Sequence, residues 1–347
     1  MPGKRSPRAT PDELALIEEI RRRERAAPGA VRIGIGDDCA VLQPKPGHEI
    51  CVTTDFSLEN VHFRREWHPP QSVGHRCLAR GLSDLAAMGA EPLAVFLSLA
   101  LPARLPAGWL DGFLDGFLAL AKRHRVPLAG GDTAQSPGPI LADIVAIGQV
   151  LKGHARLRSA AKAGDFLYVT GALGGAAAEL NTLSRHPRRF RALTHAEPDR
   201  PHLYPEPRVS VGLRLRDRIH ACIDISDGLS TDLTHLCHAS GLAARIDQAA
   251  LPIHPLAAGL PGKRTAVLRS GFDLALHGGE DYELLFTAPP SARIPRTLAG
   301  VTIHRVGTMH QAVPNQPLIA MKMWDGLSVA VQPAGWQHFA ARGKADS

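Results

Sequence analysis

The chain has 347 residues, 44% of them hydrophobic and 21% charged, which suffices for two globular domains and excludes a fibrous or disordered protein. Its formal charge of +7 raises the question of a nucleic-acid partner, but aromatic residues, on which single strands stack, make up only 5%. The apolar segments fall far short of the roughly 20 residues that span a bilayer, and the first residues contain no apolar signal segment, so we expect a cytoplasmic protein without a membrane partner.

The basic residues are concentrated in GKRSPR near the start, in RRRER at 21–25 and in the segment HPRRFRALTHAEPDRPH that begins at His186. None of these segments is interleaved with the aromatic residues that base stacking needs. A solvated basic surface is therefore favoured over a nucleic-acid interface.

The five cysteines are dispersed and form no CxxC pair. We expect reduced, mostly buried thiols rather than a disulfide framework or a structural zinc site. Cys237 lies between His235 and His238 on a predicted helix, where two imidazoles three residues apart resemble a soft-metal site. With no further ligand cluster nearby, an ordinary helix surface is favoured.

In the first part of the chain, β-rich segments alternate with helical ones. Thr10, Pro11 and Glu13 stand where an N-cap, a first-turn proline and a capping-box acid would stand, and they predict a helix over 14–27. The other predicted elements are strands at 31–36, 49–54, 93–101, 126–130 and 140–150, and helices at 72–88 and 109–124.

A second series of elements begins near residue 164. It consists of strands at 165–171, 221–226, 243–248, 282–288 and 301–307, helices at 174–184 and 230–240, and a loop at 185–208. Both series mix helices with sheet strands, so we predict an α+β protein with a domain boundary between residues 152 and 165.

Carboxylates recur at the ends of apolar segments, beside small residues. The six segments are IGIGDD (Asp37, Asp38), TTD (Asp55), LSD (Asp84), AGGD (Asp132), DISDG (Asp224, Asp227) and GGED (Glu280, Asp281). Because ligands bind near strand ends in sheet-based folds, we expect these acids to converge on one cleft. Convergent carboxylates repel one another unless cations hold them, and Mg²⁺ fits best because it takes carboxylate, water and phosphate oxygens.

Glycine pairs precede two of these acids, Gly130 and Gly131 before Asp132 and Gly278 and Gly279 before Glu280. Glycines let backbone amides approach phosphate oxygens closely, although a single Gly-Asp step is more often only a turn. The chain contains no P-loop and no protein-kinase motif set, and TGALGG is too loose for a dinucleotide-binding fingerprint.

The motifs IGDDCAVL, TTDFSLENVHF, LSDLAAMGAEP, AGGDT, RSAAKAGDFLYVTG, DISDGLSTDL and GGEDYELLF follow one another in this order. In this respect the chain, from about residue 33 to 339, resembles the thiamine-monophosphate kinase family. That family belongs to an ATP-binding superfamily with aminoimidazole ribonucleotide synthetase, selenophosphate synthetase and a hydrogenase maturation factor.

The resemblance implies an aminoimidazole ribonucleotide synthetase-like α+β fold in which each of two domains is a β-sheet covered by helices. Residues 1–151 would form an N-terminal domain that binds ATP and Mg²⁺ and pairs with its copy in a homodimer. Residues 152–347 would form a C-terminal domain that completes the active-site cleft.

The resemblance also assigns residues. Metal ligands fall on Asp38, Thr53, Thr54, Asp55, Asp84, Asp132, Asp224 and Asp227. ATP contacts fall on Gly131, Asp132, Arg158 and Ser226, and thiamine monophosphate contacts on His62, Glu280 and Trp336. Among these, Asp55, Asp132 and Arg158 are implied to carry catalysis.

The implied reaction transfers the γ-phosphoryl group of ATP, the co-substrate, onto the phosphate of thiamine monophosphate, giving thiamine diphosphate and ADP. Such a transfer needs charge neutralisation and alignment more than a protein nucleophile, which agrees with several Mg²⁺ ions and leaves room for a monovalent cation such as K⁺. Arg158, with Lys162, would stabilise transferred charge, and Trp336 would cover the cationic thiazolium ring.

Several residues have an ordinary alternative reading. His62 is either a core histidine or a donor to phosphate, and Trp336 is either a packing residue or a ligand contact. Arg76 and Arg80, four residues apart on a helix, fit phosphate contacts and solvated charges equally.

Local patterns give three further expectations. If VRIGIGDD is a strand, alternation places Asp38 on its glycine side, and Asp37 on its apolar side unless the strand has already turned. Alternation also places Asp281 on the face opposite Glu280, which alone is assigned a role. Asn60 stands where the family commonly has Gly, and Asn tolerates a left-handed backbone.

Two rivals to the kinase remain open. The first is another ATP-dependent synthetase or dehydratase of the superfamily, although the chain ends in ARGKADS without the terminal Cys of the hydrogenase factor. The second is a basic nucleic-acid-binding protein on a degenerate enzyme fold, against which the intact series of acids argues, because acids repel a phosphate backbone.

Overall fold

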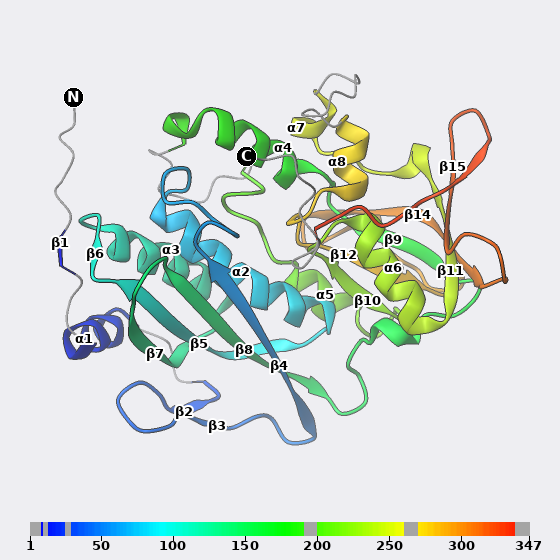
Figure 1. Ribbon diagram of the computed structural model, residues 1–347. Helices are drawn as coiled ribbons and strands as arrows, with labels where there is room; N and C mark the ends of the chain where they lie inside the picture. The colour runs from blue at the N-terminus through cyan, green and yellow to red at the C-terminus, as the bar shows by residue number, and fades with distance from the viewer. Residues whose placement is uncertain (1–7, 10–12, 25–28, 191–199, 260–269, 337–347) are drawn as a thin grey trace. The chain divides into compact units, whose positions relative to one another are not determined.

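The computed structural model describes residues 8–9, 13–24, 29–190, 200–259 and 270–336 (Figure 1). The chain divides into two compact units, residues 1–156 with 179–218 and residues 157–178 with 219–347. In the described residues, no helix is both long enough and apolar enough to cross a bilayer.

The first change of unit along the chain follows Arg156, within the predicted boundary region of 152–165. Residues 179–218 differ from the expectation, because they belong to the first unit although they follow the start of the second. The physical reason is a buried polar and apolar interface between this segment and the helix over 70–87, described below.

The first unit is built on a four-stranded sheet of order β4–β8–β5–β7. Its strands are β4 (His48–Leu58), β5 (Glu91–Pro102), β7 (Leu128–Ser136) and β8 (Leu141–Leu151). All pairs are antiparallel except β5 with β7. Alternation gives the sheet two unlike faces: residues such as Leu97, Ile144 and Ala146 are buried, whereas Val52 and Phe56 on the other face are 60% and 55% exposed.

Two helices cover the buried face, α2 (Pro70–Ala87) and α3 (Trp109–His124) (Figure 1). Helix α2 starts with Pro70 in its first turn and places Gly81 against Ala146 and Ile144 of β8. The two helices approach closely, because a Cβ on Gly116 would lie 1.8 Å from the carbonyl oxygen of Gln71. Small residues therefore set the distance between the helices that cover the sheet.

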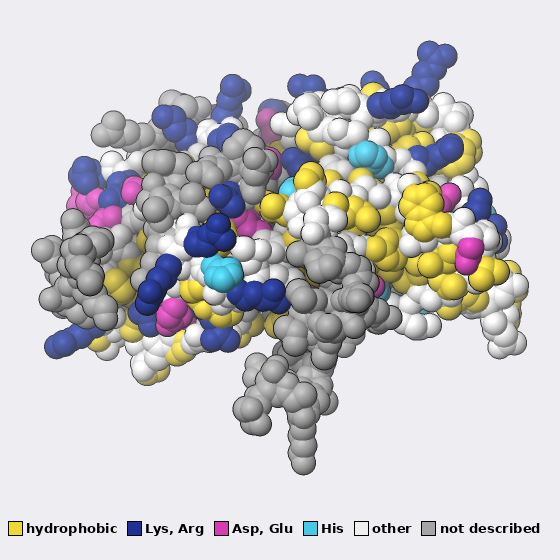
Figure 2. Space-filling model, turned by 90° about the horizontal axis from the view of Figure 1, so that it is seen from above, with side chains coloured by type: hydrophobic (Ala, Val, Ile, Leu, Met, Phe, Trp, Pro, Cys, Tyr) yellow, Lys and Arg dark blue, Asp and Glu magenta, His cyan; other side chains and the backbone are white. Residues whose placement is uncertain are grey.

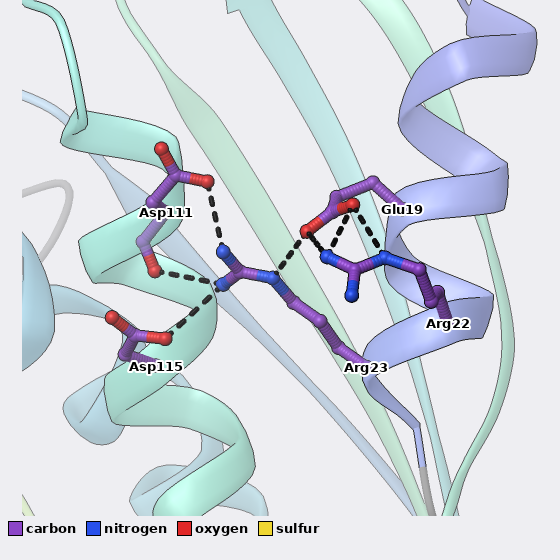
Figure 3. Close-up of polar contacts among 5 residues, drawn as sticks. All are labelled: Glu19, Arg22, Arg23, Asp111 and Asp115. Carbon is purple, nitrogen blue, oxygen red and sulfur yellow. Dashed lines mark hydrogen bonds and ion pairs between the residues drawn. The ribbon is translucent and has the colours of Figure 1, made fainter.

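Helix α1 (Glu13–Arg23) is held to α3 by one arginine (Figure 3). Arg23 pairs with Glu19 at 2.7 Å, with Asp111 at 2.9 Å and with Asp115 at 3.1 Å. Arg23 and Arg22 lower the pKa of the Glu19 carboxyl through hydrogen bonds. The predicted capping residues Thr10 and Pro11 lie outside the described residues.

Short elements complete the first unit. They are the strand pairs β1 (Arg8–Ala9) with β6 (Arg104–Leu105) and β2 (Val31–Ile33) with β3 (Val41–Leu42), the 3₁₀ helix η2 (Pro187–Arg189) and the helix α5 (Val209–Leu215). Helix α5 packs on α2, where a Cβ on Gly212 would lie 2.1 Å from the carbonyl oxygen of Ala86. The change of unit at residue 179 falls within α4 (Gly175–Arg185).

The segment around His202 is buried against α2. Arg76 donates to the carbonyl oxygen of His202 at 2.9 Å, His75 lies 2.8 Å from the carbonyl oxygen of Pro205, and Glu179 accepts the His202 N–H at 2.9 Å. Burial lowers the pKa of His75 to about 4, so its imidazole is neutral at pH 7. These bonds explain why part of the predicted loop 185–208 belongs to the first unit.

The second unit contains an eight-stranded sheet of order β10–β12–β9–β14–β11–β15–β16, with β13 paired to β14. The strands are β9 (Phe166–Thr170), β10 (Cys222–Ile225), β11 (Leu242–Asp247), β12 (Glu283–Ala288), β13 (Thr297–Leu298), β14 (Val301–Gln311), β15 (Ile319–Lys322) and β16 (Ser328–Ala330). Only β11 and β15 pair in parallel. Every residue of β10 and β12 is buried, so both strands lie within the core.

The helical elements of this unit, besides α4, are α6 (Leu229–Ser240), α7 (Pro255–Ala258), α8 (Gly271–His277) and the 3₁₀ helices η1 (Arg158–Ala160) and η3 (Gln248–Ala250). Helix α6 buries Leu229, Leu233 and Leu236 in the core and leaves His235 and His238 exposed. Cys237 is buried, and burial raises the pKa of its thiol to about 12. The ordinary helix surface predicted here is confirmed, and three of the five free thiols, Cys77, Cys222 and Cys237, are buried.

Candidate active site

Strand β4 and helix α2 bring one group of predicted metal ligands together. The Thr53 hydroxyl donates to the Asp84 carboxylate. Thr53 pairs with Ala146 and Asp55 pairs with Ile144 in the sheet, so both side chains lie on the face that α2 covers. The half-buried Asp55 is thus on the same side of the sheet as Asp84.

Thr54 and Asp132 lie on the opposite face of this sheet. Asp132 is the β7 partner of Ser98, and Ser98 is the β5 partner of Asp143. Asp143, which the sequence analysis did not single out, is half-buried, and burial raises the pKa of its carboxyl. The strand register therefore places Asp132 and Asp55 on opposite faces of the sheet. Alternation within each strand could not reveal this, because it does not tell how the two strands are placed in the sheet.

The two glycines before Asp132 have a packing reason that differs from the expected phosphate contact. A Cβ on Gly131 would lie 1.9 Å from the carbonyl oxygen of Leu97, and a Cβ on Gly130 would lie 2.9 Å from the ring of Phe96. Both positions need glycine for β7 to pair closely with β5.

The strand predicted over 31–36 is shorter in the structure, and the chain has turned before Asp37 and Asp38. Strand β2 ends at Ile33, and the chain turns at Gly36, whose φ is +116°. The alternation rule therefore does not reach the two acids, and both are exposed. The Asp37 carboxylate accepts the backbone N–H of Asp38 at 3.0 Å, which gives Asp37 a role in shaping the turn that presents Asp38.

His62 follows β4 in a turn in which Asn60 has a φ of +70°, the left-handed conformation expected for it. The Nδ1 atom of His62 accepts the backbone N–H of Leu58 at 3.0 Å. In the neutral imidazole the proton then resides on Nε2, and an N–H group of this kind is a donor that a phosphate oxygen can accept. Arg76 donates to the backbone carbonyl of His62 at 3.1 Å and fixes this turn.

The solvated reading of Arg76 and Arg80 is wrong, because the two residues are only 3% and 8% exposed. Arg76 connects the His62 turn to the His202 segment, and Arg80 donates to the carbonyl oxygen of Phe56 at 3.3 Å. Both arginines support strand β4 and the turn after it from within the first unit.

In the second unit, the DISDG segment turns from β10 into α6 around Gly228. The buried Asp232 carboxylate accepts the backbone N–H groups of Asp227, at 3.1 Å, and Gly228, at 3.0 Å. Burial, followed by the charges of Asp224 and Asp227, raises the pKa of Asp232 to about 8. Asp232 thus holds the backbone of the turn that carries two predicted metal ligands, a role that sequence analysis missed.

The GGED segment is hydrogen-bonded to the DISDG segment. Glu280 donates its backbone N–H to the carbonyl oxygen of Ser226 at 2.7 Å, and Tyr282 donates to that of Ile225 at 2.9 Å. A Cβ on Gly279 would lie 2.7 Å from the Ser226 carbonyl oxygen, so glycine is needed for this approach. The residue assigned to ATP and one assigned to substrate are therefore neighbours.

Trp336 is joined to the same turn. Its backbone N–H donates to the carbonyl oxygen of Asp227 at 3.2 Å, and the N–H of Gly335 donates to the Thr231 hydroxyl at 3.1 Å. The Trp336 side chain is 51% exposed. The DISDG, GGED and late Trp segments of the second unit thus form one hydrogen-bonded group.

Arg158 is exposed in η1, where its carbonyl oxygen accepts the Ser240 hydroxyl at 2.7 Å. Because η1 ends at Ala160, Lys162 does not lie on the same helical turn as Arg158. Both cations remain on one short segment of the second unit.

The donor set on these segments consists of carboxylate and hydroxyl oxygens, which suits a hard cation such as Mg²⁺. In the described part of the chain, no three or more Asp, Glu, His or Cys side chains gather closely enough to hold a metal ion.

Asp232→Asn is expected to stabilise the protein at pH 8 in EDTA, raising Tm by about 3 °C or more. The raised pKa means that the folded state favours protonated Asp232. In the wild-type protein, the stability gained from this protonation is fully present below about pH 4 and is lost as the pH rises towards 8. Asn keeps the acceptor oxygen and cannot ionise. Thermal melting at pH 8 and pH 5 measures the effect, which should shrink at pH 5.

The exposed Asp325, which accepts the Leu327 N–H at 2.9 Å, is the control, and Asp325→Asn should leave Tm unchanged at both pH values. Equal melting of wild type and Asp232→Asn at pH 8 would contradict a pKa of Asp232 that burial and the neighbouring charges raise.

Two family models match the chain, one in each of its main parts. Residues 36–150 match the family model "AIR synthase related protein, N-terminal domain", and residues 162–310 match "AIR synthase related protein, C-terminal domain". The thiamine-monophosphate kinase of Salmonella typhimurium is 37% identical over 342 residues, covering 94% of this chain and 98% of that protein. The chain belongs to the thiamine-monophosphate kinase family. The enzyme of that name from Bacillus subtilis is 32% identical over 335 residues, covering 94% of this chain and 99% of that protein.

Solved structures of the family share the fold. The thiamine-monophosphate kinase from Stenotrophomonas maltophilia K279a superimposes with a TM-score of 0.73 at 37% identity, covering 91% of this chain and 97% of that one. AaThiL complexed with AMPPCP and TMP superimposes with a TM-score of 0.71 at 25% identity, covering 94% and 97%. The α+β two-domain fold predicted from the sequence is confirmed.

Proposed function

We propose that this chain is a thiamine-monophosphate kinase that transfers the γ-phosphoryl group of ATP to the phosphate of thiamine monophosphate. The observation that carries the proposal is the hydrogen-bonded group of the second unit, in which Glu280 and Trp336 bond to the backbone of Ser226 and Asp227. It joins segments assigned to nucleotide, metal and substrate. AMPPCP, an ATP analogue, and TMP are bound together in the AaThiL structure, which supports the same pair of substrates here.

The residues of the chain act by binding and orienting rather than by covalent chemistry. The Nε2–H of His62 donates to the phosphate of the substrate, and the Arg158 guanidinium pairs with phosphate oxygens of the nucleotide. Glu280 and Trp336 bind the cationic thiazolium end through opposite charge and ring contact. This orientation aligns the acceptor phosphate with the γ-phosphate for in-line attack.

Mg²⁺ fits the oxygen donors of the site. Bound metal would neutralise phosphate charge and complete its shell with phosphate oxygens and water. In this proposal, the ligands in the first unit are Asp38, Thr53, Thr54, Asp55, Asp84 and Asp132, and those in the second unit are Asp224 and Asp227. The low number of ligands on any one segment agrees with metals that are held jointly by protein and substrate phosphates.

A homodimer is supported by the open face of the first-unit sheet. Ile50, Val52 and Phe56 of β4 are 45%, 60% and 55% exposed and lie in a row on this face. A second copy of the same domain would cover such an apolar face by isologous contact. The cytoplasmic location and a monovalent cation stay predictions.

The nucleic-acid rival receives less support. Among the described residues on the face shown in Figure 2, Lys and Arg side chains form several groups, and Asp and Glu side chains lie near some of them. A continuous basic stripe would be expected of a protein that follows a phosphate backbone.

Purified full-length protein with Mg-ATP and thiamine monophosphate is expected to release ADP and form thiamine diphosphate in equal amounts, measured by chromatography of both products. Omission of Mg²⁺ should abolish both. ADP release that requires a different acceptor would favour another ATP-dependent enzyme of the superfamily. No product together with tight, salt-sensitive RNA or DNA binding would overturn the kinase assignment.

A further inference from the structure

The segment Glu280–Tyr282, between α8 and β12, has an unusual backbone. Glu280 has a φ of +68° and Tyr282 a φ of +51°, both in the left-handed region that residues with a side chain rarely adopt. Two such residues on either side of Asp281 persist only where surrounding bonds fix them. The predicted alternation of this segment as a strand is wrong for the same reason, since β12 begins only at Glu283.

The Asp281 side chain accepts hydrogen bonds from a part of the backbone that is distant in the sequence. Its side chain is buried, with the residue 8% exposed. One carboxylate oxygen accepts the backbone N–H of Gly174 at 2.6 Å, and the other accepts that of Ala176 at 3.1 Å. Asp281 therefore binds the first turn of α4, more than 100 residues away in the sequence.

The TGALGG segment is shaped to reach this carboxylate. Gly174 has a φ of +82°, and a Cβ on it would lie 2.6 Å from the backbone nitrogen of Ala275. A Cβ on Gly175 would lie 2.6 Å from the ring of His254. The glycines thus allow the helix N-terminus to approach α8 and to donate to Asp281, so the anion bound by these amides is a carboxylate of the chain itself.

Burial raises the pKa of Asp281 to about 7, and the N–H groups of Gly174 and Ala176 oppose that rise. Burial of a carboxyl group without hydrogen-bond donors costs free energy of folding. The hydrogen bonds from Gly174 and Ala176 therefore help to hold the Asp281 side chain in its buried position. Next to it, the Glu280 backbone bonds to Ser226.

We propose that Asp281 is a positioning residue for substrate binding: by anchoring its segment to the first turn of α4, it holds Glu280 in the left-handed conformation that directs the Glu280 side chain to thiamine monophosphate. This inference rests on the proposed function, because Glu280 is assigned to substrate only there. Asp281 itself does not touch substrate and acts through Glu280.

The test is a double-mutant cycle on the full-length enzyme with Asp281→Asn, Glu280→Gln and the double variant. Asp281→Asn is expected to raise KM for thiamine monophosphate by about 10-fold or more and KM for ATP by less than about 2-fold. In the Glu280→Gln background, Asp281→Asn should change KM for thiamine monophosphate by less than about 2-fold, because the residue through which it acts is already altered.

Asp281→Glu is measured in the same cycle. It keeps the charge and both acceptor oxygens on a longer side chain. It serves as the second variant if Asp281→Asn shows no cooperative melting. Asp247→Asn is the matched control, because Asp247 caps η3 through the N–H of Ala249 at 2.9 Å and should leave both KM values unchanged.

Additive effects in the cycle, or equal rises of both KM values in a folded variant, would overturn the proposal. These outcomes differ from failure of the proposed function, in which the wild-type enzyme forms no thiamine diphosphate.

Discussion

Asp55→Asn is expected to lower kcat by about 10²-fold or more while Tm changes little, because it removes a charge from a proposed metal ligand and preserves the shape of the side chain. Asp55 lies on the face of β4 that bears Thr53, whose hydroxyl donates to Asp84. Initial rates at saturating Mg-ATP and thiamine monophosphate, with thermal melting on the same samples, measure the effect. A wild-type kcat in this variant would contradict a metal role for Asp55.

The control lies on the same strand. Glu49 is an exposed acid that accepts the Gly153 N–H at 3.1 Å, so Glu49→Gln should keep this bond and leave kcat unchanged. Asp132→Asn extends the test to the other face of the sheet and should also lower kcat about 10²-fold or more if both acids serve the same phosphates. Loss of kcat in only one of the two variants would show that the two faces serve different roles.

Much of the fold could be predicted from periodicity. The helix predicted over 109–124 has those bounds in α3, and the helix predicted over 72–88 is α2, over 70–87. Both helices are long enough for their apolar face to be visible in the sequence. Helix α8, with seven residues, was not predicted, because its start depends on a capping box between Ser270 and Asp273 and not on a repeating pattern.

The sequence allows the candidate site to be proposed as a set of segments but does not give their arrangement. Motif order identified the assigned residues, whereas the face on which each side chain lies depends on strand register, as Asp132 and Asp55 illustrate. The roles of Asp232 and Asp281 could not be predicted, for a different reason. Each is a buried acid whose partners are backbone N–H groups, and backbone donors have no signature in the sequence.

Gly335→Ala is expected to displace Trp336 and to raise KM for thiamine monophosphate about 10-fold or more. A Cβ on Gly335 would lie 2.0 Å from the carbonyl oxygen of Asp227 and 2.6 Å from the Thr231 hydroxyl. Asp227 cannot yield easily, because it lies in the turn fixed by Asp232, and Thr231 is buried in α6. The segment that carries Trp336 must therefore move away from this turn.

The matched control is Gly138→Ala, because a Cβ there would meet nothing within 4 Å, and both KM values should stay unchanged. Trp336→Ala removes the ring without adding a Cβ at position 335, so it tests the ring alone. Loss of a cation–π contact of about 0.5–2 kcal/mol corresponds to a rise in KM for thiamine monophosphate of roughly 2- to 30-fold. Because Gly335→Ala would remove the proposed ring contact and also disturb the Asp227 turn, its effect should equal or exceed that of Trp336→Ala. A Gly335→Ala enzyme with wild-type KM, beside a Trp336→Ala enzyme with raised KM, would contradict positioning of Trp336 by this close approach.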